Sequence, residues 1–193
     1  MDSKKPLFIF SSATAFLSGF FLAVLVFALL YAGGYVIPKS SAQNIATPLF
    51  SPGSEDDIIL LIQSSQNTLD LEMYTFSNMH LADAIVESAG RGVKCRVMLE
   101  ARIQGSDSVL KMANYLSSHG VEVRFASNKF TLTHSKLLII DGKKVLVGSI
   151  NFSNNAVLKN REAAVILEGP VANDYESIFN QDWDIASPSV SNT

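Results

Sequence analysis

Residues 133–151 read THSKLLIIDGKKVLVGSIN and form the most informative segment of the chain. Two apolar runs flank an Asp-Gly pair, which is a strong signal for a tight β-hairpin. The hairpin would carry an imidazole and an ammonium where it opens, and a hydroxyl and an amide where it closes: His134, Lys136, Ser149 and Asn151. Strand ends with no further task do not need such a set, so we regard this end as a candidate site.

The geometry of a hairpin predicts that these polar groups meet. Alternate residues of a strand share a face, so His134 and Lys136 point the same way. A reversal at Asp141 and Gly142 would bring the return strand alongside, and Gly148 would let the backbone approach a ligand closely. The set would then surround one point and suit a phosphoryl group.

Each residue also has an ordinary structural explanation. A lone His-x-Lys pair is unremarkable on a protein surface. Asp141 is explained by the turn itself, and Ser149 and Asn151 could satisfy backbone groups in a loop. Only the combination points to chemistry.

Around the hairpin, helical and extended patterns alternate. Helical spacing of apolar residues is found near residues 54–62, 81–88, 109–116 and 170–183, and strand patterns are found at 68–74, 93–100, 121–125 and 162–168. This order predicts an α/β domain with a mixed β-sheet flanked by helices, covering residues 54–185 and followed by a short tail at 186–193. Ligands of such sheets tend to sit where strands end.

The N-terminal part has a different character. No residue between Lys5 and Lys39 is charged, and residues 7–37 are long enough to cross a bilayer as a transmembrane helix. We expect a tail at 1–6, this anchor, and a linker at 38–53 that is rich in Ser, Pro, Ala and Asn.

The alternative for the apolar segment is a cleaved secretory signal, with Ser40 and Ala42 forming a small-residue cleavage site. Lys4 and Lys5 before the span, against Lys39 after it, favour an N-terminus inside and a folded domain outside the cytoplasm.

Charge and composition narrow the partners. The net charge is −3, which argues against a protein that coats nucleic acid by bulk positive charge. Residues 124–161 nevertheless hold seven basic residues against one acidic residue, a net charge of +6. The single cysteine, Cys95, excludes an intrachain disulfide and a cysteine-rich metal site, and no other residues show metal-ligand spacing. Three phenylalanines in or next to this window are candidates either for stacking on bases or for the core: Phe125, Phe130 and Phe152.

The fixed positions of the hairpin resemble the HKD motif of the phospholipase D superfamily. The match is His134-x-Lys136, four residues, Asp141, six residues, then Gly148-Ser149-x-Asn151. Three further segments are similar to the small, single-motif branch of that superfamily: MYTF at 73–76, AGRGVKCRVML at 89–99 and NRE at 160–162. That branch includes bacterial endonucleases and mitochondrial, membrane-anchored phospholipase D-like proteins.

The resemblance extends over about residues 54–183 and implies a phospholipase D-like fold. It also implies a two-step transfer at a phosphodiester through a covalent phosphohistidine on His134. Lys136, Ser149 and Asn151 would hold the non-bridging oxygens, and Glu162 would orient the imidazole. The alternative for Glu162 is a surface carboxylate at a strand end. No metal ion or other cofactor is implied.

This mechanism needs two histidines, whereas the chain has one motif. His80 lies at an expected helix start and His119 at an expected helix end, and neither is followed by a lysine two residues later, so we expect both to be structural. We therefore expect a homodimer in which two copies of His134 and Lys136 complete one active site.

The chain departs from its relatives in two places. It lacks the cysteine- and histidine-rich insertion of some mitochondrial members, and Glu100 stands where an aspartate is frequent. Three functions remain open: an endonuclease on DNA or RNA, which we favour, a phospholipase D-type hydrolase of phospholipids, and a non-catalytic scaffold.

Overall fold

The computed structural model describes residues 20–22, 24–25, 28, 43–102 and 106–189. The chain divides into two units, Met1–Ser41 and Ala42–Thr193, and the fold is that of the second. The predicted anchor at 7–37 lies almost entirely outside the described residues. No helix in the described part has both the length and the apolar character of a membrane span. The anchor therefore stays a prediction.

The second unit is built on one seven-stranded sheet with the order β1-β7-β6-β5-β2-β3-β4. The strands are β1 (Ile45–Ser51), β2 (Thr68–Met73), β3 (Lys94–Leu99), β4 (Glu122–Phe125), β5 (Lys136–Ile140), β6 (Lys144–Gly148) and β7 (Glu162–Glu168). Strands β2, β3 and β4 are parallel, because a helix returns the chain between them, whereas β5 and β6 form the hairpin and pair antiparallel. The predicted mixed sheet is confirmed.

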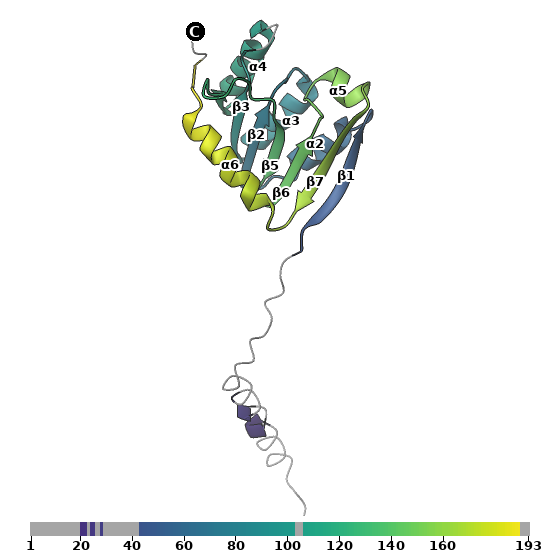
Figure 1. Cartoon of the computed structure of the whole chain (residues 1–193), viewed down its shortest axis with the longest axis vertical. Helices are drawn as coiled ribbons and strands as arrows, with labels where there is room; N and C mark the ends of the chain where they lie inside the picture. Colours follow the sequence, from purple (N-terminus) through teal and green to yellow (C-terminus); the bar gives the residue numbers. More distant parts are fainter. Residues whose placement is uncertain (1–19, 23, 26–27, 29–42, 103–105, 190–193) are drawn as a thin grey trace, which may run out of the picture. The chain divides into compact units, whose positions relative to one another are not determined.

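Helices cover both faces of this sheet. They are α2 (Glu55–Gln63), α3 (Met79–Gly90), α4 (Ser106–Ser118), α5 (Asn154–Leu158) and α6 (Ala172–Ile185). One core joins α2, α3, α4 and α5 to one face, with buried residues such as Ile62, Ile85 and Leu116. A second core joins Phe179 and Trp183 of α6 to Leu137 and Val145 on the other face. Figure 1 shows α6 crossing the strands of the hairpin.

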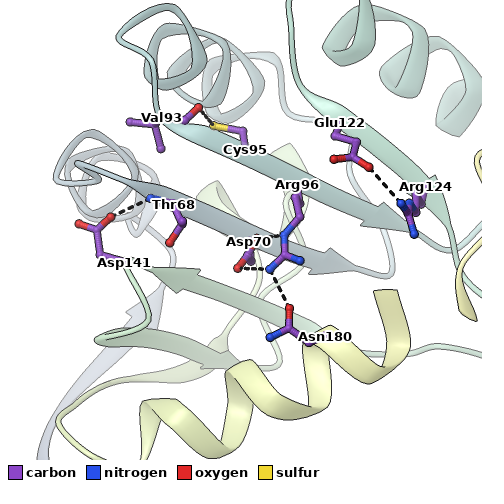
Figure 2. A network of polar contacts seen from close by, with 9 residues as sticks. All are labelled: Thr68, Asp70, Val93, Cys95, Arg96, Glu122, Arg124, Asp141 and Asn180. Atoms are coloured by element: carbon purple, nitrogen blue, oxygen red, sulfur yellow. Dashed lines mark hydrogen bonds and ion pairs between the residues drawn. The ribbon is translucent and has the colours of Figure 1, made fainter. Parts of the chain in front are cut away.

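A buried polar cluster lies under α6 (Figure 2). Asp70 of β2 accepts two hydrogen bonds from Arg96 of β3, at 2.6 and 2.8 Å, and Arg96 donates a third to Asn180 of α6. The Arg96 guanidinium also lies 4.9 Å from the ring centre of Phe179. The Asp70 carboxylate is thus buried but fully paired, as a charge in a core must be.

The prediction of a linker at 38–53 was wrong for residues 45–51. They form β1, which pairs antiparallel with all seven residues of β7, from Ile45 opposite Glu168 to Ser51 opposite Glu162. Pro48 in mid-segment hides the strand from pattern reading, because proline is tolerated only in edge strands such as this one. The folded unit therefore begins before Ser54.

Helix α5 was missed as well. It has five residues, too few to show a helical period. Its start is set by Ser153, whose hydroxyl accepts a hydrogen bond from the backbone N–H of Ala156. In the sequence, this short helix connects the hairpin to β7.

Candidate active site

A pocket opens at the end of the hairpin that the sequence marked. It has a volume of about 450 Å³, which is within the usual range for ligand sites, and it is lined by His134, Lys136, Gly148, Ser149, Asn151 and Glu162. All five residues predicted to be catalytic thus line one pocket. Their chemical roles remain predictions.

Strand ends explain this convergence. Lys136 is the first residue of β5, Gly148 is the last residue of β6 and Glu162 is the first residue of β7. Because these three strands are neighbours and antiparallel, their ends meet at one edge of the sheet. The side chains at that edge therefore share a pocket although 26 positions separate Lys136 from Glu162.

The imidazole and the ammonium are in direct contact. Lys136 Nζ lies 3.0 Å from His134 Nδ1 and 3.2 Å from Nε2, and it donates to the His134 carbonyl at 2.7 Å. An ammonium has donors only, so a hydrogen bond to the ring would use a nitrogen that carries no proton, and Lys136 Nζ lies within reach of both ring nitrogens. An imidazole, which can act as a nucleophile, thus lies beside a cation.

Lys136 is only 8 % exposed. Burial lowers the pKa of its ammonium, and the negative charge of Glu162 opposes this shift. An ammonium that has lost most of its water gains more from an anionic ligand than an exposed one does. The pocket is therefore suited to an anion.

The Glu162 carboxylate accepts a hydrogen bond on each of its two oxygens. Ser149 Oγ donates to Glu162 Oε2 at 2.6 Å, and Asn160 Nδ2 donates to Oε1 at 3.1 Å. These two hydrogen bonds lower the pKa of Glu162 and keep it ionised. Within the described part of a single chain, the carboxylate has no hydrogen bond to His134, so its predicted orienting role stays untested.

The amide of Asn151 is oriented by the backbone. Its Oδ1 accepts a hydrogen bond from the N–H of Thr75 at 3.2 Å. This contact turns the oxygen toward the end of β2. The NH₂ group is then the part of Asn151 that can donate to a ligand.

Asp141 and Gly142 form the turn at the opposite end of the hairpin, away from the pocket. Both have positive φ, 53° and 61°. The Asp141 carboxylate accepts backbone hydrogen bonds at the start of β2, at 2.7 Å from Asn67 and 2.9 Å from Thr68 (Figure 2). Asp141 therefore closes the turn and also fixes the hairpin to β2.

The structure gives a reason for a glycine at position 148 that the sequence did not, and the predicted close approach to a ligand stays a prediction. A side chain there would meet the neighbouring strand, because an added Cβ would lie 2.4 Å from the Ala163 carbonyl oxygen and 2.4 Å from Ala164 Cα. Glycine allows β7 to approach, and this close approach brings Glu162 to Ser149.

One residue at the site was not singled out from the sequence. The ring of Tyr74 lies 4.3 Å from the His134 ring, centre to centre, and 4.8 Å from Lys136 Nζ. Tyr74 directly follows β2 within the MYTF segment, so its position at a strand end was the available signal.

His80 and His119 do not line the pocket. His80 Nδ1 lies 3.3 Å from Glu55 Oε2, and His119 Nδ1 lies 2.7 Å from the Tyr115 carbonyl oxygen. Both contacts join neighbouring turns or helices of the fold. Among the described residues, no group of three or more His, Cys, Asp or Glu side chains is arranged to hold a metal ion.

The basic residues of segment 124–161 do not all lie at the pocket, although their density in the sequence suggested one positively charged region. Lys143 and Lys144 lie at the turn end of the hairpin, and Lys144 pairs with Glu168 at 3.3 Å. Apart from Lys143, the exposed basic residues within five positions of a pocket residue in the sequence are Lys129, Lys159 and Arg161. Of the three phenylalanines considered for stacking, Phe125 and Phe152 are buried, whereas Phe130 is 42 % exposed.

Comparison with known proteins now places the chain. The family model described as "Cardiolipin synthase, PLD-like domain" matches residues 58–183. Mitochondrial cardiolipin hydrolase of Xenopus tropicalis is 31 % identical over 68 % of this chain and 62 % of its own length, and phospholipase D of Rickettsia typhi is 26 % identical over 69 % and 65 %. The chain thus spans less than two thirds of these relatives.

Solved structures agree on the fold. The phospholipase D family member Nuc from Salmonella typhimurium superposes with a TM-score of 0.71 at 24 % identity, covering 77 % of this chain and all of Nuc. NucT from Helicobacter pylori gives 0.65 at 20 % identity, covering 75 % and 99 %. With the family match over most of the folded unit, these findings show that the chain belongs to the phospholipase D superfamily.

Proposed function

We propose that this protein is a metal-independent phosphodiesterase that works through a covalent phosphohistidine on His134. The observation that carries the proposal is the pocket itself, which is lined by an imidazole, a buried ammonium in contact with it, and a carboxylate whose pKa is lowered. Each has a role in phosphoryl transfer. The enzymes named among the curated relatives, cardiolipin hydrolase and phospholipase D, support hydrolytic chemistry.

The reaction would proceed in two steps. An imidazole nitrogen of His134 attacks phosphorus, the N–P bond forms, and the bond to the leaving oxygen breaks while an acid protonates that oxygen. Water then attacks phosphorus, gives a proton to the same acid–base group, and releases His134. Lys136, Ser149 and Asn151 would stabilise the non-bridging oxygens.

The acid in this scheme would be His134 of a second copy. His80 and His119 are engaged elsewhere, so a single chain offers the pocket one imidazole. A homodimer with two-fold symmetry would bring two identical half-sites together. We propose this dimer as the active form.

For the substrate we favour nucleic acid, as an endonuclease on DNA or RNA. Phe130 is exposed on the segment that leads into His134, where its ring can stack on an unpaired base. Lys129, Lys159 and Arg161 are exposed near pocket residues in the sequence and would neutralise flanking phosphates.

Phospholipid hydrolysis is the second candidate, because relatives at 29–31 % identity are named cardiolipin hydrolase. The predicted N-terminal anchor would hold the domain at a membrane, with the domain outside the cytoplasm. Such tethering is compatible with either substrate. The substrate must therefore be decided by experiment.

In the test, the purified full chain is incubated, with and without chelator, with each of four substrates. These are single-stranded DNA, RNA, duplex DNA and labelled phospholipid vesicles. We expect cleavage of nucleic acid by the wild type, and none by His134→Ala. Hydrolysis of lipid alone would replace the first substrate class with the second. Activity lost on chelation would contradict the metal-independent mechanism, and no hydrolysis of any substrate would favour a scaffold.

A further inference from the structure

Glu100 is a buried carboxylate that lies outside the pocket. It follows β3 directly and is 1 % exposed. Arg102 binds it through the side chain, with Nε 2.8 Å from Oε1 and Nη2 2.6 Å from Oε2, and the Arg102 backbone N–H donates to Oε1 at 2.8 Å. The side-chain contact is a bidentate, charge-assisted ion pair, which belongs to the strongest class of side-chain hydrogen bonds.

The pair also holds the segment between β4 and β5. Glu100 Oε2 accepts a hydrogen bond from the backbone N–H of Thr133 at 2.8 Å. Arg102 Nη1 donates to the carbonyl oxygen of Phe130 at 2.7 Å. Two side chains at the end of β3 thus fix the backbone at two points, one on each side of the exposed Leu132.

Thr133 directly precedes His134. The hydrogen bond from Thr133 to Glu100 therefore fixes the backbone from which the His134 side chain projects. Beyond it, the His134 carbonyl accepts from Lys136 Nζ, and the Ser135 carbonyl accepts from the backbone N–H of Tyr74. On the N-terminal side of His134, the described hydrogen bonds of Thr133 and Phe130 are made with Glu100 and Arg102. Without them, the chain from Ala126 to His134 would be held less firmly ahead of the pocket.

We propose that Glu100 and Arg102 form a positioning pair that holds the segment from Phe130 to Thr133 and thereby keeps His134 in line with the phosphorus. The role rests on the proposed phosphodiesterase function. It also assigns a purpose to the glutamate at a position where an aspartate is frequent in the family. A glutamate has one more methylene, and here its two oxygens reach both Arg102 and Thr133.

Asp70 offers a matched control. It is also 1 % exposed and also forms a bidentate ion pair with an arginine, Arg96. Unlike Glu100, it lies under α6 (Figure 2). Asp70→Asn removes a buried charge of the same kind without touching the segment before His134. Glu100→Gln does the same to the positioning pair while keeping the side-chain shape.

Kinetics on a small chromogenic phosphodiester separate the two cases. For Glu100→Gln we expect kcat to fall about 10- to 100-fold with little change in KM, because a small displacement of a nucleophile costs this much. Arg102→Met, at a partly exposed side chain, should lower kcat in the same direction and supplies the answer if Glu100→Gln does not fold. Asp70→Asn should stay within about twofold of the wild type once folded. Equal losses of kcat in Asp70→Asn and Glu100→Gln, or unchanged kcat in Glu100→Gln and Arg102→Met, would overturn the proposal.

Hydrogen exchange of the full chain tests the pair even if no phosphodiester is hydrolysed. In Glu100→Gln, the peptide covering residues 130–136 should exchange about tenfold faster, while peptides from β6 and β7 stay protected. In Asp70→Asn, the peptide 130–136 should match the wild type. Unchanged exchange at 130–136 in Glu100→Gln would refute the pair, whereas faster exchange with no activity in the wild type would refute only the proposed function.

Discussion

At Gly148 the chain has no room for a side chain, because the backbone of β7 occupies the place where a Cβ would lie. We expect Gly148→Ala to lower the free energy of unfolding by about 1–3 kcal/mol, the usual cost of overpacking. The added methyl group would also push β7 and Glu162 away from Ser149. Urea denaturation measures the first effect, and hydrolytic activity measures the second.

The matched control is Gly90→Ala at the end of α3, where an added Cβ meets nothing within 4 Å. We expect this variant to be as stable as the wild type or more stable by a few tenths of a kcal/mol to about 1 kcal/mol. Equal stability losses in both variants would show that the close approach of β7 is not the cause.

The lowered pKa of Asp141 predicts that the free energy of unfolding depends on pH in the acidic range. Burial opposes its ionisation, but hydrogen bonds from Thr68, Asn67 and Gln66 outweigh burial and lower its pKa below the ordinary 3.8. A carboxyl group with a lowered folded-state pKa stabilises the fold above its unfolded pKa, and this contribution is lost as the pH falls through the folded pKa.

Asp141→Asn keeps the side-chain shape and tolerates the positive φ, so it tests the charge alone. We expect a loss of about 1–2 kcal/mol at pH 7, with the difference from the wild type shrinking below about pH 4. Urea denaturation at pH 7, 5 and 3 measures this trend. A difference that stays constant over these pH values would contradict the assigned role.

Among the elements, α2 and α5 offer a matched pair of helix starts. Ser153 caps α5 through its hydroxyl, whereas Ser54 precedes α2 without a side-chain cap. Within the described part of the chain, Ser54 Oγ is buried and has no hydrogen-bond partner. The same residue type is therefore stabilising at one helix and unfavourable at the other.

We expect Ser153→Ala to destabilise the fold by about 1 kcal/mol, the typical value of a lost cap. Ser54→Ala should be neutral or stabilising, because it removes a buried polar group that lacks a partner. Thermal and urea denaturation of both variants check this order. The reverse order would show that the hydroxyl of Ser54 finds a partner in solution.

Strand β1 shows how an element far from the motif supports the site. It covers the whole edge of β7, and Ser51 at its end donates a hydrogen bond to the Ala156 carbonyl in α5. β7 begins with Glu162, so β1 stabilises the strand that carries the pocket carboxylate. A fragment beginning at Ser54 would lack this support, and functional work should retain residues 43–53.

At the scale of the whole molecule, the proposed dimer makes a quantitative prediction. If each active site needs His134 from two copies, wild type and His134→Ala chains would form mixed dimers without activity. After subunit exchange at equal amounts, we expect about one quarter of the initial specific activity per total chain. Independent monomers would retain about one half. Molecular mass measured across the same concentration range provides the accompanying control.

Most of the architecture could be predicted from local sequence patterns. The long amphipathic helices and the alternating strands were predicted from apolar period, and the hairpin was predicted from Asp141 and Gly142. Periodicity works there because a long buried face must repeat with the geometry of its element. The motif spacing also predicted which side chains share the pocket, because strand register carries His134, Lys136, Ser149 and Asn151 to one edge.

The remaining features depend on contacts between segments that are far apart in the sequence. β1 and α5 are stable through contacts with β7 and the core, and neither has a period of its own to read. The role of Gly148 depends on the backbone of β7, and that of Glu100 depends on Thr133, 33 positions away. Contacts between distant segments leave no local signal. They arise only when packing brings those segments together. In the proposed dimer, the second half of the active site is likewise supplied by contact with another chain.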